Sequence, residues 1–210
     1  MKIALFYYDG FAEFEAALVG LLFREHERIS VALDEREYRS VEGRRFCVDQ
    51  ALEGTDTASI DRMVIPGGNP EPLLENKELK EFMEGLVARK KLIAGICGGA
   101  ALMAGLGLLR GKKCMGGSSG LKPGDTEFAF SAEADYSDAH VVVDGNFITA
   151  QGQAYAEFAV ELARQRGCIQ AAKSMRRIYA GSRTCARRCA ASWPPLRQPA
   201  HIQRTEWEIG

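Results

Sequence analysis

The stretch KLIAGICGGAAL, residues 91–102, predicts a buried β-strand that breaks directly into a helix, with a cysteine at the break. Its first half is continuously apolar, which is typical of a strand covered on both faces. The small residues Gly95, Gly98 and Gly99 permit the tight turn of a nucleophile elbow, which lifts one side chain above the sheet edge. A small buried cysteine in an ordinary strand-to-helix turn is the alternative interpretation.

Cys97 stands at this break and is the candidate nucleophile. At the N-terminus of a helix, the dipole and the unpaired N–H groups favour thiolate over thiol. We therefore expect the pKa of Cys97 to lie below that of a free cysteine, and Cys97 to be the most reactive thiol of the chain.

Length and composition indicate a globular domain. A chain of 210 residues with 46% hydrophobic content can bury a sizeable core. No apolar run approaches the ~20 residues that span a bilayer, and the chain starts with a strand rather than a signal peptide. Six widely spaced cysteines do not suggest a disulfide framework. We expect a cytoplasmic protein with reduced thiols and no membrane partner.

The charge is unevenly distributed along the chain. Residues 1–174 hold 20 basic and 26 acidic side chains, a net charge of −6, whereas residues 175–210 hold seven arginines and two glutamates, a net charge of +5. The acidic body argues against nucleic acid as a partner. We predict an α/β domain over residues 1–173 and an arginine-rich, atypical tail over residues 174–210.

The nature of this tail stays open. It has no sustained helical or strand period and is interrupted by prolines. It is either an adhesive tail or a C-terminus altered by a shifted reading frame, and a nucleic-acid contact is less favoured. Cys185 and Cys189 lack the spacing of a zinc motif, so we expect no metal site.

The body alternates between strand and helix patterns. Strands are predicted at 2–8, 28–34, 62–66, 92–96 and 111–115, helices at 12–23, 100–109 and 154–166, a loop with an amphipathic helix at 70–90, and hairpins at 37–50 and 140–150. This order predicts a mostly parallel sheet between two helical layers, with inserted β-hairpins. Asp144-Gly145 favours a type I′ turn in the second hairpin.

Two further segments follow strands whose carboxyl ends meet near Cys97, and ligands bind at that edge in open α/β sheets. Glu13 and Glu15 lie in the first strand-to-helix connection, where a helix N-terminus also favours acids. That explanation is preferred for Glu13. Gly67-Gly68 allows close backbone approach and could supply an N–H group as an oxyanion donor, although a plain tight turn explains it equally.

Four motifs in order resemble the ThiJ/PfpI superfamily: Phe14-Glu15 after the first strand, IPGG at 65–68, AGICGGA at 94–100, and VDGNFITAQG at 143–152 leading to Glu157. The resemblance covers residues 1–167. It includes the Parkinson-disease-protein-like branch and the class I glutamine amidotransferase-like domain, and implies a flavodoxin-like three-layer α/β sandwich that is usually a homodimer.

The resemblance also implies a site. By position, Cys97 is the elbow cysteine, Glu15 is a protonated glutamate that donates a hydrogen bond to it, and the N–H groups of Gly68 and Gly98 form an oxyanion pocket. Protease-like relatives carry a histidine directly after the cysteine, whereas Gly98 stands there. This difference argues against proteolysis.

A third catalytic residue stays open. The Parkinson-protein-like branch has a histidine several residues before the Asp-Gly hairpin, and Glu133 stands near that place. His140 is the nearby histidine and is more simply interpreted as structural. The third group is therefore His140, Glu133 or none.

Two functions fit these residues. The first is a cysteine-dependent hydrolase or lyase of amidase, glyoxalase or deglycase type, in which Cys97 attacks a small carbonyl or amide compound and Glu15 carries the proton, without metal or cofactor. The alternative is a redox or stress sensor whose Cys97 is oxidised without turnover. A family scaffold without activity is the plainest possibility.

Overall fold

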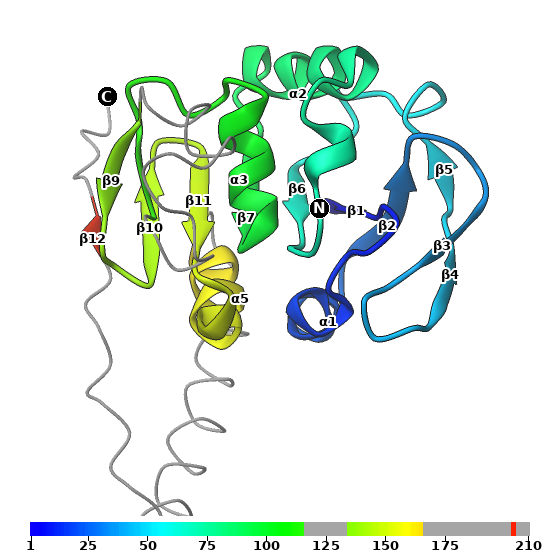
Figure 1. The fold of residues 1–210 in the computed structure, drawn as a ribbon, viewed down its shortest axis with the longest axis horizontal. Helices are drawn as coiled ribbons and strands as arrows, with labels where there is room; N and C mark the ends of the chain where they lie inside the picture. Colours follow the sequence, from blue (N-terminus) through cyan, green and yellow to red (C-terminus); the bar gives the residue numbers. More distant parts are fainter. Residues whose placement is uncertain (116–133, 166–202, 205–210) are drawn as a thin grey trace, which may run out of the picture.

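The computed structural model describes residues 1–115, 134–165 and 203–204. A central sheet is covered by α2 and α3 on one face and by α1 and α5 on the other (Figure 1). Its strand order is β12-β10-β11-β7-β6-β1-β2-β5. The predicted tail at 174–210 lies outside the described residues except for β12, and the predicted boundary after residue 173 and Glu133 lie outside them as well.

The elements of the described residues have the following bounds. The strands are β1 (Lys2–Phe6), β2 (Glu27–Ala32), β3 (Glu37–Arg39), β4 (Arg45–Cys47), β5 (Gln50–Ala51), β6 (Arg62–Ile65), β7 (Leu92–Ile96), β8 (Lys113–Met115), β9 (Asp135–Ser137), β10 (Val141–Asp144), β11 (Phe147–Ala150) and β12 (Gln203–Arg204). The helices are α1 (Glu13–Leu22), α2 (Lys77–Ala88), α3 (Gly98–Gly105) and α5 (Tyr155–Arg164), with short 3₁₀ turns at Glu71–Leu73 and Gly152–Ala154.

The predicted α/β class and parallel sheet are confirmed. The neighbours β2-β1-β6-β7-β11 all pair in parallel, and β10 runs antiparallel to β11. The predicted first hairpin is the antiparallel pair β3-β4, which lies outside the main sheet. The segment β9, where no strand was predicted, pairs in parallel with β8. This pairing gives the backbone of the segment hydrogen-bond partners.

The turn of the second hairpin differs from the prediction. Asp144 pairs with Phe147, so Gly145 and Asn146 are the two central residues. Only Gly145 of these two has a positive φ, of 61°. A type I′ turn needs a positive φ at both positions, whereas a glycine at the first position alone is the pattern of type II′.

Buried side chains fill both spaces between the sheet and its helices. Met83 and Met103 belong to the cluster beneath α2 and α3, and Val19 and Phe158 to the cluster beneath α1 and α5. No helix in the described part of the chain has the length and apolar character to cross a membrane.

Arg62 is an unexpected charge inside the second of these layers, with 1% of its surface exposed. Its guanidinium donates to the backbone carbonyls of Leu162 and Gln165 at the end of α5, and lies over the Phe23 ring at 5.1 Å. A cation is favourable at the carboxyl end of a helix dipole. Arg62 therefore joins β6, α1 and α5 at the edge opposite the elbow.

Glycines bring three chain segments together beside Cys97. A Cβ added to Gly99 would overlap the backbone carbonyl of Ile65 at the end of β6. A Cβ added to Gly98 would lie 2.6 Å from the carbonyl oxygen of Gly68. The ends of β6 and β7 and the start of α3 can therefore meet only because these positions carry no side chain.

We predict that Gly99→Ala destabilises the protein by about 3 kcal/mol or more, the upper range for overpacking, because the opposing atoms are backbone and cannot rotate away. Thermal unfolding measures this loss. Gly20→Ala is the matched control, because Gly20 lies within α1 and an added Cβ meets nothing within 4 Å. This control should stabilise the chain by up to about 1 kcal/mol. Equal effects of the two substitutions would contradict the close approach.

Candidate active site

The backbone of Cys97 has an unusual conformation. Cys97 lies at the junction between β7 and α3, where it has a φ of 53° and a ψ of −125°. Such a conformation costs about 1–3 kcal/mol in a residue other than glycine. The Cys97 N–H donates to the Ala150 carbonyl at 2.8 Å, and its carbonyl accepts from the Ala100 N–H at 3.1 Å. The predicted sharp turn is therefore present, and it is fixed to the neighbouring strand β11.

Glu15 reaches this turn from the first turn of α1. Only 2% of its surface is exposed. Its Oε2 accepts from the Gly67 N–H at 2.6 Å, and its carboxyl group forms a hydrogen bond with the Cys97 thiol. A Cβ on Gly67 would lie 2.6 Å from both Cys97 Cβ and Glu15 Oε2. The structure thus brings Glu15, Gly67 and Cys97 into direct contact.

Burial controls the ionisation of Glu15. It raises the pKa of this carboxyl group from 4.5 to about 7, although the Gly67 N–H and the Cys97 thiol favour the carboxylate. The nearby carboxylate of Glu42 raises this pKa further. Both protonation states of Glu15 are therefore accessible near neutral pH.

The expected lowering of the Cys97 pKa is wrong. Burial of the thiol raises its pKa, and the negative charge of Glu15 raises it further. The N–H groups of Gly98 and Gly68 form hydrogen bonds with the sulfur and lower the pKa, but the sum is an increase. The prediction considered the helix N-terminus, which lowers a thiol pKa, but the burial that raises it cannot be read from the sequence.

Two residues that the sequence analysis did not single out complete the surroundings of the thiol. The Tyr8 hydroxyl donates to the Gly67 carbonyl at 2.8 Å and to the Pro66 carbonyl at 3.1 Å, which fixes the turn that holds Glu15. A Cβ on Gly152 would lie 3.3 Å from the Cys97 sulfur and 3.0 Å from Glu15 Oε1. Tyr8 follows β1 and Gly152 follows β11, so their position at the carboxyl ends of these strands was the available signal.

The hairpin β3-β4 caps the helix that carries Glu15. The N-cap residue of α1, Ala12, has no side-chain hydrogen bond to offer. Instead the Glu42 carboxylate at the hairpin turn accepts from the N–H groups of Glu13 at 3.2 Å and Phe14 at 3.4 Å. Carboxylates are favourable at helix N-termini. Glu13 also contacts the hairpin, since it pairs with Arg44.

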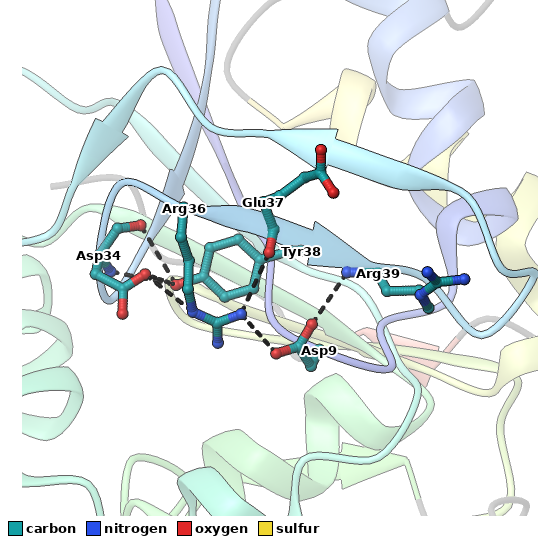
Figure 2. A network of polar contacts seen from close by, with 6 residues as sticks. All are labelled: Asp9, Asp34, Arg36, Glu37, Tyr38 and Arg39. Carbon is teal, nitrogen blue, oxygen red and sulfur yellow. Dashed lines mark hydrogen bonds and ion pairs between the residues drawn. The ribbon is translucent and has the colours of Figure 1, made fainter.

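A polar network anchors the same hairpin to the loop after β1 (Figure 2). The Asp9 carboxylate pairs with Arg36 at 2.8 Å and accepts from the Arg39 N–H at 3.0 Å. The Arg36 guanidinium lies over the Tyr38 ring at 4.1 Å. The next residue, Gly10, donates its N–H to the Arg39 carbonyl at 2.7 Å. The hairpin is therefore fixed to the β1–α1 connection at two places.

His140 lies at the same sheet edge, immediately before β10. Its carbonyl accepts from the Gln151 N–H at 2.9 Å, and β11 separates β10 from the strand that leads to Cys97. Glu133 lies outside the described residues. The choice between His140, Glu133 and no third group therefore stays a prediction.

The fold and the cysteine turn define a flavodoxin-like protein with a cysteine at the carboxyl edge of its sheet. Residues 1–165 match the model of the DJ-1/PfpI family. The chain belongs to this family, and the predicted resemblance to the ThiJ/PfpI superfamily is confirmed.

Individual relatives agree with this assignment. The protein named "Putative cysteine protease YraA" of Bacillus subtilis is 30% identical over 71% of this chain and 88% of its own length. The protein named "Deglycase TK1284" of Thermococcus kodakarensis is 29% identical over 74% of this chain and 94% of its own length. The solved structure of DJ-1 superfamily protein Atu0886 from Agrobacterium tumefaciens superposes with a TM-score of 0.74 at 27% identity, covering 87% of this chain and 99% of that one.

We predict that Glu15→Gln raises the free energy of unfolding above that of the wild type by more at pH 8 than at pH 5. The folded-state pKa of Glu15, about 7, exceeds its ordinary value of 4.5, so the folded state favours the neutral acid. The stability that the neutral acid provides is fully present below pH 4.5 and is lost as the pH rises through about 7. Glutamine stays neutral throughout, so the advantage of the variant at pH 8 should reach a few kcal/mol, since one pKa unit is about 1.4 kcal/mol.

Chemical denaturation at the two pH values measures this difference. Glu84→Gln controls for the loss of an exposed carboxylate, because Glu84 lies on the outer face of α2. A Glu15→Gln effect independent of pH would contradict the assigned pKa.

Proposed function

We propose that this protein is a cysteine-dependent enzyme that acts on a small carbonyl or amide compound. Cys97 attacks the carbonyl carbon, and the N–H groups of Gly68 and Gly98 stabilise the oxyanion that forms. The observation that carries the proposal is the environment of the sulfur, which contacts these two N–H groups and the Glu15 carboxyl group together. N–H groups directed at the sulfur also lie near the carbonyl carbon that it attacks, and therefore near the oxygen bonded to that carbon.

Glu15 is the proton carrier in this proposal. Burial keeps the proton on the thiol, so a base must remove it as the sulfur attacks. A carboxylate with a pKa of about 7 can accept this proton and later return it to the product, because acid–base catalysis is most efficient when the pKa lies near the working pH. Without a described third group, we expect modest rates.

The residue after the cysteine bears on the choice between a peptide and another substrate. Several of them are named deglycases, and one carries a protease name. In this chain Gly98 follows the cysteine, and its bare backbone touches the Gly68 segment. No side chain at that position can serve as a general base, so proteolysis is not the reaction that we propose.

We predict that wild-type protein converts a member of a panel of small aldehydes and amides, and that Cys97→Ser reduces the rate to background. Serine retains the shape of the side chain but is a far weaker nucleophile at this pH. Cys47→Ser is the matched control, because Cys47 is an exposed thiol on β4 and should leave the rate unchanged. Equal rates for wild type and Cys97→Ser would exclude the covalent mechanism.

A redox sensor is the second candidate function. Cys97 is partly exposed, whereas Cys114 is buried. The N–H groups that face the sulfur could equally hold the oxygen of a sulfenic or sulfinic acid. Absence of turnover across the panel, together with selective peroxide oxidation of Cys97 in peptide mass spectrometry, would favour this function.

We also propose that the protein is a homodimer, as the family resemblance implies. Phe14 and Leu21 lie seven residues apart on α1 and expose 47% and 49% of their surface. This spacing puts them on one side of the helix. Light scattering on the eluting protein should give twice the 23.0 kDa chain mass, and Phe14→Glu should weaken the association. A monomer at micromolar concentration would contradict the proposal.

A further inference from the structure

Gln151 is a buried polar residue beside Cys97 to which the proposed function gives no role. It follows β11, whose last residue, Ala150, pairs with Ile96 and accepts the Cys97 N–H at 2.8 Å. Gln151 is therefore the neighbour of Cys97 across the sheet edge. Only 7% of its surface is exposed.

The amide of Gln151 is held at one end. Its Oε1 accepts from Gln153 Nε2 at 2.6 Å. Within residues 1–115 and 134–165, no atom accepts a hydrogen bond from the other end, Nε2. Leaving a buried donor without an acceptor costs free energy, and each such group in a native structure asks for an explanation.

The direction of the side chain follows from strand alternation. Gln151 has an extended backbone, with φ −73° and ψ 145°. Thr149, two residues earlier, faces β8, because its hydroxyl accepts from the Met115 N–H at 2.9 Å. Side chains two apart share a face, so Gln151 lies on the face where α3 begins. Gly152 faces the opposite way, toward Glu15.

The sheet edge beside Cys97 thus carries an acid, Glu15, on one face and an amide donor, Gln151, on the other. We propose that Gln151 is a substrate-positioning residue, whose side-chain N–H group donates to a second oxygen of the substrate, next to the carbon that Cys97 attacks. The inference rests on the proposed function and deepens it. The side chain of Gln153 donates to the amide oxygen of Gln151. The group that Gln151 offers to a substrate is therefore its N–H donor, which selects a hydrogen-bond acceptor.

The proposal predicts a dependence on substrate structure. Wild-type protein should favour an aldehyde with an oxygen on the adjacent carbon, such as glycolaldehyde, over propanal. Gln151→Leu should reduce kcat/KM about 3–10-fold for the first and leave the second unchanged, since one hydrogen bond is lost. Gln50→Leu, at the far edge of the sheet, is the matched control and should change neither.

A chemical test separates this inference from turnover. Iodoacetamide carries a carbonyl oxygen beside the carbon that the thiol alkylates, whereas iodoethane does not. The ratio of Cys97 alkylation rates, iodoacetamide over iodoethane, should fall about 3–10-fold in Gln151→Leu and in Gln151→Glu. The second variant retains the size of the side chain and the bond from Gln153 but loses the donor. Any effect on the thiol pKa cancels in the ratio.

An unchanged ratio in both variants would overturn the role of Gln151, whatever the enzyme turns over. A reduced ratio in a protein without turnover would leave the donor in place and refute the proposed function instead. Unfolding of Gln151→Leu does not remove the test, because Gln151→Glu and the Gln50→Leu control report on the same ratio.

Discussion

The backbone of Cys97 is the constraint on which the rest of the site depends. A positive φ in a residue other than glycine is retained only when the surroundings over-determine it. Here the Cys97 N–H is fixed to β11, and Gly98 and Gly99 let α3 begin against the ends of neighbouring chain segments. The strain at one residue is thus held by the packing around the ends of β6, β7 and β11.

The second determinant is desolvation, which acts on the acid and the thiol together. Burial raises the pKa of both Glu15 and Cys97, and the backbone N–H groups offset part of this effect. The proton therefore stays on the thiol until the sulfur attacks, and Glu15, whose pKa of about 7 lies near neutrality, is placed to accept it in that step. The hairpin β3-β4 contributes from outside, because Glu42 caps α1 and its charge raises the pKa of Glu15.

The fold could be predicted from the sequence because it depends on local patterns of apolar residues and glycines. The apolar run before Cys97 and the glycines after it predicted the strand at its observed bounds and the turn at Cys97, whereas the helix predicted at 100–109 is α3 at Gly98–Gly105. Prediction failed where the answer depends on three-dimensional surroundings. The direction of the Cys97 pKa shift depends on how deeply the thiol is buried, and the turn type at Gly145 depends on the strand register. Tyr8 and Gln151 could not be recognised from the sequence because their roles depend on neighbours that are distant in the chain.

The most direct test of the account is the pH profile of kcat/KM, measured in wild type and in Glu15→Gln. If Glu15 accepts the thiol proton, the wild-type profile rises with pH through a midpoint of about 7, as the acid becomes a carboxylate. In Glu15→Gln this limb disappears and the rate falls by about 10²–10⁴-fold, the usual contribution of a positioned acid–base group. A limb with the same midpoint in both proteins would contradict the assignment of the proton to Glu15.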